Sequence, residues 1–338
     1  MPGWRLPPLA PTAAAPPLLI AVNPARPPAT YTPQAQLLAA LLPIPSQTAT
    51  LEPTPTLRPT ASPSPSPTAA PSRPPPSPTA VSYEDPPLAT ECAGRGAIFR
   101  GRFPSGVAGP LRDYSAYLPP CYQRHGRAYP VLYLIHGSIQ TDSHWLDLGL
   151  AAVADQGLAA GRYPPFIAIM PDSGRLGNMT SGGPASIEGV TVNDLLPFVE
   201  QNFCAWPAAA GRSIGGISRG GYWALEIAFS HTDLFGAVSG HSSHLRFETD
   251  PARYNPLATY AAFDLSRLRI WLDRGESDFL RHGQDQLHAS LDAAGIGHHY
   301  FVNPGGHSDD YWAAHLGEYL DWHLSAWPLD PAAYPACA

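Results

Sequence analysis

The sequence predicts an α/β fold over residues 91–338, with a doubly wound, mostly parallel sheet and helices on both of its faces. Short continuous apolar runs, typical of strands buried on both faces, alternate with longer segments whose apolar residues have helical spacing. Near the middle of this region, a strand-like run leads through a glycine-rich turn containing a serine into a helical segment. In such sheets functional residues gather at the carboxyl ends of the strands.

The first half of this region contains four predicted strands. Two alternating segments form an antiparallel pair at the N-terminal edge of the sheet, joined by a loop rich in Pro and Gly. Two continuous apolar runs follow, separated by a helical segment, and each is expected to be buried in the sheet. The strands are residues 97–103, 112–118, 129–135 and 165–170, and the helical segment is 145–160.

The second half continues the alternation of strand and helix. A polar, glycine-rich loop over residues 175–187 precedes it and is expected to line a substrate cleft. The strand before Ser218 is followed by strands at 235–239, 268–273 and 298–302. Helices are predicted at 190–203, after Ser218 to about 230, at 278–294 and at 309–327.

Residues 1–90 have a different composition from the remainder of the chain. Residues 51–80 contain 11 Pro, 5 Ser and 5 Thr, too little apolar surface to offset the entropy of ordering. The apolar run at 13–22, after Arg5, has the order of a signal peptide but is short and broken by prolines. Neither this run nor residues 37–43 is long enough to span a bilayer. We expect a disordered N-terminal region and stalk over 1–90.

Charge and cysteine content restrict the partners and the compartment. The net charge of −7 and the absence of a basic run argue against nucleic acid as a partner. The four cysteines form no C-x-x-C pair, so no zinc site is expected from them. Pairing of Cys92 with Cys121 and of Cys204 with Cys337 is one of three possible connectivities, and free thiols are the alternative. The stalk and the cysteines favour a secreted or cell-surface protein.

The segment Gly216-Ile217-Ser218-Arg219-Gly220 matches the G-x-S-x-G nucleophile elbow, with Ser218 at its apex. Gly216 and Gly220 are expected to lie where a Cβ would strike a neighbouring strand or helix. The helix that follows directs its N-terminal amides toward any group bonded to Ser218, which suits a developing oxyanion. In a chain with 30 glycines the pattern alone also fits an ordinary turn, so other residues must decide.

A histidine is needed to take the proton of the serine and return it to the leaving group. His307 follows the strand at 298–302 in a Gly-Gly-His turn, and it is the predicted base. His241 and His244 also follow a strand but precede the candidate acids, so we expect them near the cleft. His298 and His299 open a strand and are expected to be structural.

The acid must hold the tautomer of the histidine and stabilise its charged form. In this fold the chain order is Ser, acid, His. Asp273, Glu276 and Asp278 all lie at or just after the strand at 268–273. Asp278 is preferred because it lies in the loop beyond the strand, whereas a carboxylate at the strand end often only caps a turn.

An oxyanion hole requires two preorganised backbone amides. One is expected from Arg219, directly after the nucleophile. The other should come from the turn His136-Gly137-Ser138 after the strand at 129–135, and the Ser138 amide is preferred. The alternative interpretation of this turn is a simple strand-to-helix connection.

Taken together, these motifs resemble the esterase D-like family of α/β-hydrolases, which includes S-formylglutathione hydrolase, feruloyl and acetylxylan esterases, enterochelin esterases and mycolyltransferases. The resemblance covers about residues 112–325. It is carried by four segments, at residues 114–137, 169–172, 216–221 and 305–312.

The resemblance implies an α/β-hydrolase fold with Ser218, Asp278 and His307 as the triad. It also implies that Trp145 packs near the cleft, where His136 is expected too. The turn after His136 lacks the additional glycines of many relatives.

These observations predict a serine carboxylesterase that needs no metal and no organic cofactor. Its expected substrate is a small-molecule or carbohydrate ester, and the stalk would suit an extracellular polymer. An acyltransferase that passes the acyl group to a sugar hydroxyl is the main alternative, since it would use the same triad. A non-catalytic binding protein on the same fold is a further alternative, opposed by the intact set of Ser218, Asp278 and His307.

Overall fold

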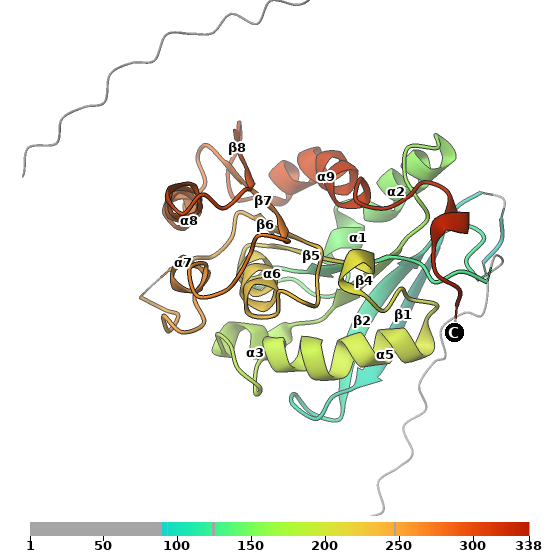
Figure 1. Ribbon diagram of the computed structural model, residues 1–338, viewed down its shortest axis with the longest axis horizontal. Helices are drawn as coiled ribbons and strands as arrows, with labels where there is room; N and C mark the ends of the chain where they lie inside the picture. Colours follow the sequence, from blue (N-terminus) through green and yellow to red (C-terminus); the bar gives the residue numbers. More distant parts are fainter. Residues whose placement is uncertain (1–89, 93, 124–125, 247, 338) are drawn as a thin grey trace, which may run out of the picture. The chain divides into compact units, whose positions relative to one another are not determined.

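A single eight-stranded sheet organises the domain in the computed structural model, which describes residues 90–92, 94–123, 126–246 and 248–337 (Figure 1). The strand order is β1-β2-β4-β3-β5-β6-β7-β8. β1 pairs antiparallel with β2, β2 pairs antiparallel with β4, and all other neighbours are parallel. The predicted fold class is therefore confirmed. The predicted stalk, apart from Thr90, lies outside the described residues.

The strands correspond closely to the predicted segments. Their bounds are β1 Ala97–Pro104, β2 Leu111–Leu118, β3 Val131–Ile135, β4 Ile167–Pro171, β5 Arg212–Ile217, β6 Ala237–His241, β7 Arg269–Gly275 and β8 His299–Asn303.

The main helices also follow the prediction. Their bounds are α1 His144–Asp147, α2 Leu150–Ala159, α3 Gly174–Met179, α4 Ile187–Gly189, α5 Leu196–Asn202, α6 Arg219–Ser230, α7 Pro256–Thr259, α8 Arg281–Ala293 and α9 Asp309–Leu324.

The helical segment predicted over 190–203 is not a single α-helix. Val190–Leu195 forms a π-helix between α4 and α5, so the helical path runs without a break from Ile187 to Asn202. Pro197 at the start of α5 has no N–H to donate to the preceding turn, which favours a wider turn there. The predicted loop at 175–187 contains a short helix, α3.

The two faces of the sheet bury two separate hydrophobic clusters. β3 shows the alternation directly: Val131, Tyr133 and Ile135 contribute to one cluster, Leu132 and Leu134 to the other. The first cluster includes side chains of α5, α6 and α8, and the second includes side chains of α1, α2 and α9. In Figure 1, α9 and α2 lie above the sheet and α5 lies below it. Both faces of the parallel strands are thus covered, as continuous apolar strands require.

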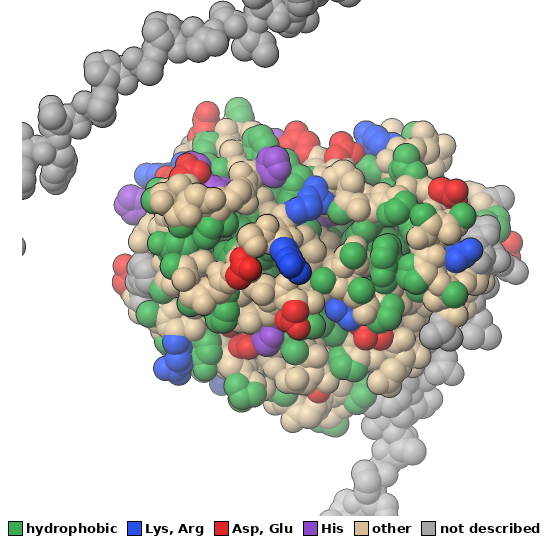
Figure 2. All heavy atoms as spheres, in the orientation of Figure 1, with side chains coloured by type: hydrophobic (Ala, Val, Ile, Leu, Met, Phe, Trp, Pro, Cys, Tyr) green, Lys and Arg blue, Asp and Glu red, His purple; other side chains and the backbone are tan. Residues whose placement is uncertain are grey.

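The polar surface mixes both signs of charge. On the face shown in Figure 2, acidic and basic side chains are interspersed with apolar ones. Among the described residues, no helix is long and apolar enough to cross a membrane.

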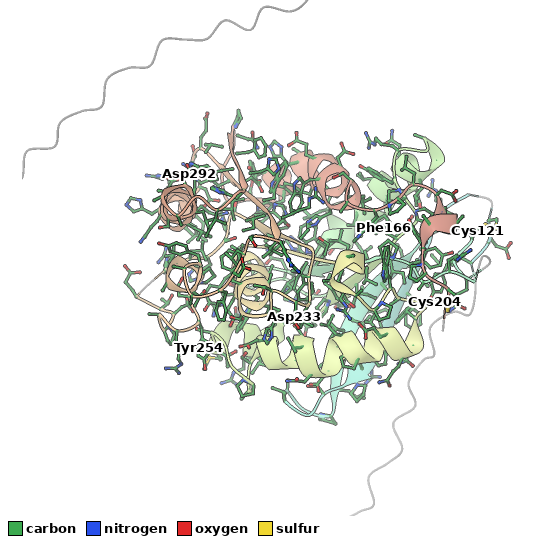
Figure 3. All side chains as sticks on the ribbon, in the orientation of Figure 1. Cys121, Phe166, Cys204, Asp233, Tyr254 and Asp292 are labelled. Carbon is green, nitrogen blue, oxygen red and sulfur yellow. A yellow bond between two sulfur atoms is a disulfide. The ribbon has the colours of Figure 1, made fainter. Side chains whose placement is uncertain are left out.

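Two disulfides connect the ends of the domain to its body. Cys92 pairs with Cys121 and Cys204 with Cys337, the pairing put forward from the sequence. Figure 3 shows Cys121 and Cys204 on the same side of the domain, and Cys204 is bonded to Cys337 in the C-terminal segment. The second bond closes a loop that contains β5 to β8, so it ties the C-terminal segment to the middle of the chain.

Loss of the long-range disulfide should cost more stability than loss of the short one. The bonds span 133 and 29 residues, and constraint of the unfolded chain increases with loop length. Replacing Cys204 and Cys337 by Ser should lower the free energy of unfolding by about 2–4 kcal/mol, and replacing Cys92 and Cys121 should lower it by about 1 kcal/mol less. Urea unfolding of both double variants measures the difference; a larger loss from the short loop would contradict it.

Candidate active site

Ser218 lies between β5 and α6 in a backbone conformation that L-residues rarely adopt, with φ 57° and ψ −117°. A Cβ on Gly216 would lie 2.2 Å from the Gly220 carbonyl oxygen, and one on Gly220 would lie 2.1 Å from the Ile135 carbonyl oxygen. Both positions therefore require glycine, as the elbow motif predicts. The turn holds the Ser218 hydroxyl at the carboxyl end of a central strand.

The structure brings Ser218, His307 and Asp278 together. His307 Nε2 lies 2.9 Å from Ser218 Oγ, and His307 Nδ1 lies 3.1 Å from each carboxylate oxygen of Asp278. Ser218 follows β5, Asp278 follows β7 and His307 follows β8. The arrangement can remove a proton from the serine through the imidazole, while the carboxylate accepts a hydrogen bond from the Nδ1–H group.

Asp278 is fully buried and well supplied with donors. Its Oδ1 accepts the backbone N–H of Leu280 at 2.7 Å, and the Ser242 hydroxyl also bonds to its carboxylate. Burial alone would raise the pKa of Asp278, but the hydrogen bond from His307, with those from Ser242 and Leu280, lowers it below its ordinary value. Asp278 therefore carries its charge at neutral pH.

Two aromatic rings enclose the imidazole of His307. Phe279 packs on it with ring centroids 4.5 Å apart, and Trp312 meets it edge-on at 5.0 Å. Trp312 Nε1 donates to the Ser242 hydroxyl at 3.2 Å, so the same tryptophan also contacts the residue that holds Asp278. His307 and Asp278 are thus fixed by one set of side chains.

The predicted oxyanion amides belong to two segments that meet at Ser218, the start of α6 and the turn after β3. Arg219 is the first residue of α6, where backbone N–H groups have no partner within the helix. The turn after β3 passes over the serine: a Cβ on Gly137 would lie 3.4 Å from Ser218 Cβ. Asn178 Nδ2 donates to the Ser138 carbonyl at 2.7 Å and fixes this turn.

The Arg219 side chain has a separate function in the structure. Its guanidinium is buried and donates to the carbonyl of Gly177 and to the carboxylate of Asp250, each at 2.9 Å. It also lies over the Tyr222 ring, 4.1 Å from the centroid. Arg219 therefore joins the elbow to α3 and to the loop between β6 and α7.

The site opens into a pocket of about 450 Å³. Ile139 and Phe279 line it with 91% and 66% of their surface exposed, so its rim is apolar. His244 also lines the pocket. Burial, followed by the charge of Arg219, lowers the pKa of His244, which is therefore neutral at neutral pH.

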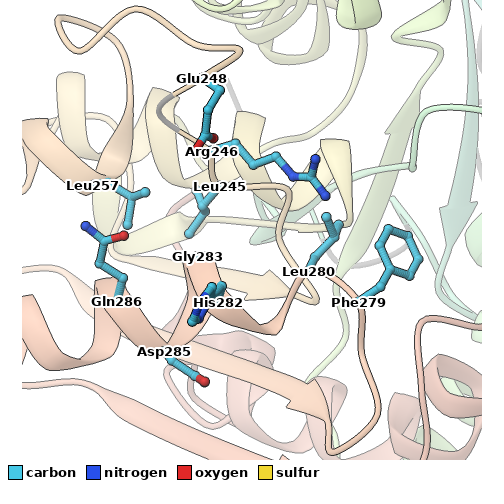
Figure 4. A pocket seen from close by; sticks show the side chains of 10 residues that line it. All are labelled: Leu245, Arg246, Glu248, Leu257, Phe279, Leu280, His282, Gly283, Asp285 and Gln286. Carbon is cyan, nitrogen blue, oxygen red and sulfur yellow. The ribbon is translucent and has the colours of Figure 1, made fainter.

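A second, larger groove adjoins this pocket. It measures about 620 Å³ and shares Phe279 and Leu280 with the first. Figure 4 shows Phe279 and Arg246 at one end of it. The remaining lining combines polar side chains with apolar residues: Glu248, His282, Asp285 and Gln286, with Leu245, Leu257 and Gly283.

Three residues that were expected near the cleft are buried and do not line the pocket. The ring of His136 joins the Gly137 carbonyl, 2.6 Å from Nδ1, to the Ser173 amide, 2.9 Å from Nε2. Trp145 packs edge-on against His241 in the core, with centroids 5.9 Å apart. Trp145 belongs to the second hydrophobic cluster, and the His241 ring is stacked on Tyr319 of the same cluster, so both side chains point to the interior.

His241 pairs with Asp273, the acid that was not preferred. Its Nδ1 lies 2.5 Å from Asp273 Oδ1, and its Nε2 lies 2.8 Å from Ser239 Oγ. Tyr311 and Tyr319 each donate to Asp273 Oδ2 at 2.8 Å. All of these side chains are buried, so this second Ser-His-Asp group has no access to a substrate.

Sequence reasoning missed Ser242 and Phe279. Ser242 carries a positive φ of 50°, and no sequence pattern announces a serine hydroxyl turned toward an acid in the next loop. Phe279 directly follows Asp278, and an aromatic residue beside a predicted acid is a weak but usable signal.

Comparison with known proteins gives the same family along most of the domain. The family model described as "Putative esterase" matches residues 109–323. An esterase of Mycobacterium tuberculosis is 35% identical over 154 residues, which are 44% of this chain and 33% of the relative. The match thus spans about a third of the length of that curated relative.

Solved structures give the same fold. A ferulic acid esterase has a TM-score of 0.60 at 23% identity, covering 69% of this chain and all of the other. An S-formylglutathione hydrolase from Staphylococcus aureus has a TM-score of 0.61 at 16% identity, covering 68% of this chain and all of the other. At these identities the likeness establishes the fold.

The two buried aspartates should respond differently to the same substitution. Asp278→Asn should lower turnover on an ester by about 10⁴-fold, because His307 loses its charged partner. Asp273→Asn should lower the free energy of unfolding by roughly 3 kcal/mol, because it breaks a buried pair. Steady-state kinetics with urea unfolding separates the two. If the 10⁴-fold loss of turnover occurred only in Asp273→Asn, the catalytic acid would be Asp273 and not Asp278.

Proposed function

The chain belongs to the "Putative esterase" family of α/β-hydrolases, and from this premise we propose that it is a serine carboxylesterase. The observation that carries the proposal is the aligned set of Ser218, His307 and Asp278 at the mouth of a pocket. Ser218 attacks the ester carbonyl while His307 accepts its proton, and His307 then protonates the departing alcohol. Water releases the acid from the acyl-enzyme by the same route.

The negative charge of the tetrahedral intermediate is held by the backbone amides of Arg219 and Ser138. The first amide opens α6, so the helix dipole adds to its effect. The second belongs to the turn that is anchored through Asn178. Asp278 keeps its charge because its pKa is lowered, and this charge stabilises the protonated form of His307. No step requires a metal ion or an organic cofactor.

The pocket and the adjoining groove indicate a substrate with two unlike parts. The apolar rim at Ile139 and Phe279 suits an acyl chain or an aromatic acid. The polar side chains in the groove beyond Phe279 suit a hydroxyl-rich alcohol such as a sugar chain, with Arg246 and Gln286 as hydrogen-bond donors. We therefore favour esters carried on carbohydrate. Hydrolysis is favoured over acyl transfer because the pocket stays open to water.

An extracellular location agrees with the covalent structure. Both cysteine pairs of the domain are oxidised, and disulfides persist outside the reducing cytosol. A polymeric carbohydrate ester would be met in the same compartment.

A panel of p-nitrophenyl esters from acetate to long chains, with methyl ferulate, tests the reaction class. The wild-type protein should hydrolyse at least one ester, and Ser218→Ala should lose turnover by about 10⁴-fold or more while keeping its melting temperature. Labelling by a fluorophosphonate, lost in Ser218→Ala, measures the nucleophile independently. If wild type and Ser218→Ala hydrolyse alike, the assignment of Ser218 fails. Transfer of the acyl group to added sugar in preference to water would identify the acyltransferase.

A substitution in the groove should change KM only for substrates that are long enough to enter the groove. Arg246→Ala should raise KM about tenfold for a feruloylated oligosaccharide, because one charged hydrogen bond is lost, and leave methyl ferulate unchanged. Arg102→Ala is the matched control, since Arg102 is exposed on β1 away from the groove. If Arg246→Ala changed KM equally for both substrates, the groove would have no part in binding the longer one.

A further inference from the structure

Three side chains of metal-binding type gather where α8 ends and β8 begins. They are His288 and Asp292 of α8 and His298, which directly precedes β8. One ligand atom of each lies within 4.8 Å of the other two. We propose that this cluster binds one divalent transition-metal ion of the Zn²⁺ class. Sequence reasoning treats His298 as structural and expects no metal, because no spacing motif joins these residues.

His298 is held in the form that ligates a metal. Its side chain is only 2% exposed, and its Nδ1 lies 2.8 Å from the carbonyl oxygen of Ile296. A carbonyl can only accept, so Nδ1 carries the proton and Nε2 keeps a free electron pair. Metal-ligating histidines are oriented in this way by a carbonyl or carboxylate on their other nitrogen.

The other two groups face that electron pair. His288 Nδ1 lies 2.8 Å from His298 Nε2, and the His288 ring is stacked on Tyr300 with centroids 4.2 Å apart. Asp292 is one helical turn beyond His288, with Oδ2 3.5 Å from His288 Nε2 and Oδ1 3.8 Å from His298 Nε2. Ligand atoms around a tetrahedral Zn²⁺ with bonds of 2.0–2.1 Å are about 3.3 Å apart. One nitrogen of each histidine and one oxygen of Asp292 lie within 4.8 Å of one another, so small side-chain rotations bring this set to that spacing.

Binding of the metal shifts a proton within one imidazole. In the free protein His288 Nδ1–H donates to His298 Nε2. When the ion enters between these nitrogens, the His288 proton moves from Nδ1 to Nε2, so His288 stays neutral and both of the facing nitrogens donate electron pairs to the metal.

The ligand types select the metal. Two imidazoles with one carboxylate suit Zn²⁺, Ni²⁺ or Cu²⁺, whereas Ca²⁺ and Mg²⁺ prefer sets of oxygen ligands. The side chains of His288 and Asp292 are 33% and 63% exposed, which leaves a path for the ion and room for water as a fourth ligand. Asp285, on the same helix face, is already paired with Arg274 and Tyr300 and is not a ligand.

The ion would join α8 and β8, whose other ends lie next to Asp278 and His307 in the chain. α8 begins just after Asp278, and β8 leads into the loop of His307. Figure 3 places Asp292 on α8, beside β8. The expected effect is on stability, since no ligand belongs to the catalytic site.

The test is titration of the EDTA-treated full-length protein with ZnCl₂, followed by calorimetry and thermal unfolding. We expect one saturable site and a melting temperature that rises with Zn²⁺ but not with Ca²⁺. Asp292→Asn and His288→Ala should each weaken binding at least tenfold. His315→Ala is the matched control, because His315 is a partly exposed histidine paired with Glu318 outside the cluster.

Two further readouts keep the proposal falsifiable. Bound Co²⁺ should give the intense visible absorption of a tetrahedral site, lost in Asp292→Asn. Asp292→Asn should leave ester hydrolysis unchanged, so failure here is distinguishable from failure of the proposed function. Absence of saturable Zn²⁺ binding by the wild-type protein would overturn the proposal, as would an equal loss of affinity in His315→Ala.

Discussion

The backbone of Ser218 is the constraint on which the site depends. Its φ of 57° is costly for a serine and persists only where the surroundings fix it. The Ser218 amide donates to the carbonyl of His241 at 2.9 Å, and the amide of His244 donates to the Ser218 carbonyl at 2.9 Å. β5, β6 and α6 are thereby joined at one residue. This joining exposes the hydroxyl and leaves the first amides of α6 free for an oxyanion.

The end of β6 supports this elbow in three ways. The carbonyl of His241 and the amide of His244 hold Ser218, while the hydroxyl of Ser242 holds Asp278. The same strand end is anchored in the core, since the His241 ring is bonded to Asp273 and stacked on Tyr319 at 3.7 Å. Burial raises the pKa of Tyr319, which therefore remains a donor to that carboxylate. The buried pair thus positions the strand from which the catalytic contacts extend.

Much of this arrangement could be predicted from the sequence. The alternation of apolar strands and helices determines the sheet, and Ser218, Asp278 and His307 stand out because each directly follows a strand. The burial of His241 could not be predicted, since it follows the predicted strand at 235–239 just as His307 follows the one at 298–302, whereas in the structure it is the last residue of β6. What separates them is depth: β6 lies between β5 and β7, and the His241 side chain points to the interior cluster. Such depth arises from tertiary packing, which one chain's pattern does not encode locally.

Access is what distinguishes the two Ser-His-Asp groups. Ser239, His241 and Asp273 have hydrogen-bond distances as short as those at Ser218, but no surface reaches them. A nucleophile needs a neighbouring space for the carbonyl that it attacks, and only Ser218 has one. Phe279 bounds that space, packs on His307 and divides the pocket from the polar groove. A substrate that occupied both the pocket and the groove would contact Phe279 from both sides and hold its ring in place. Because that ring packs on His307, binding of the substrate in the groove would also fix the orientation of the His307 imidazole.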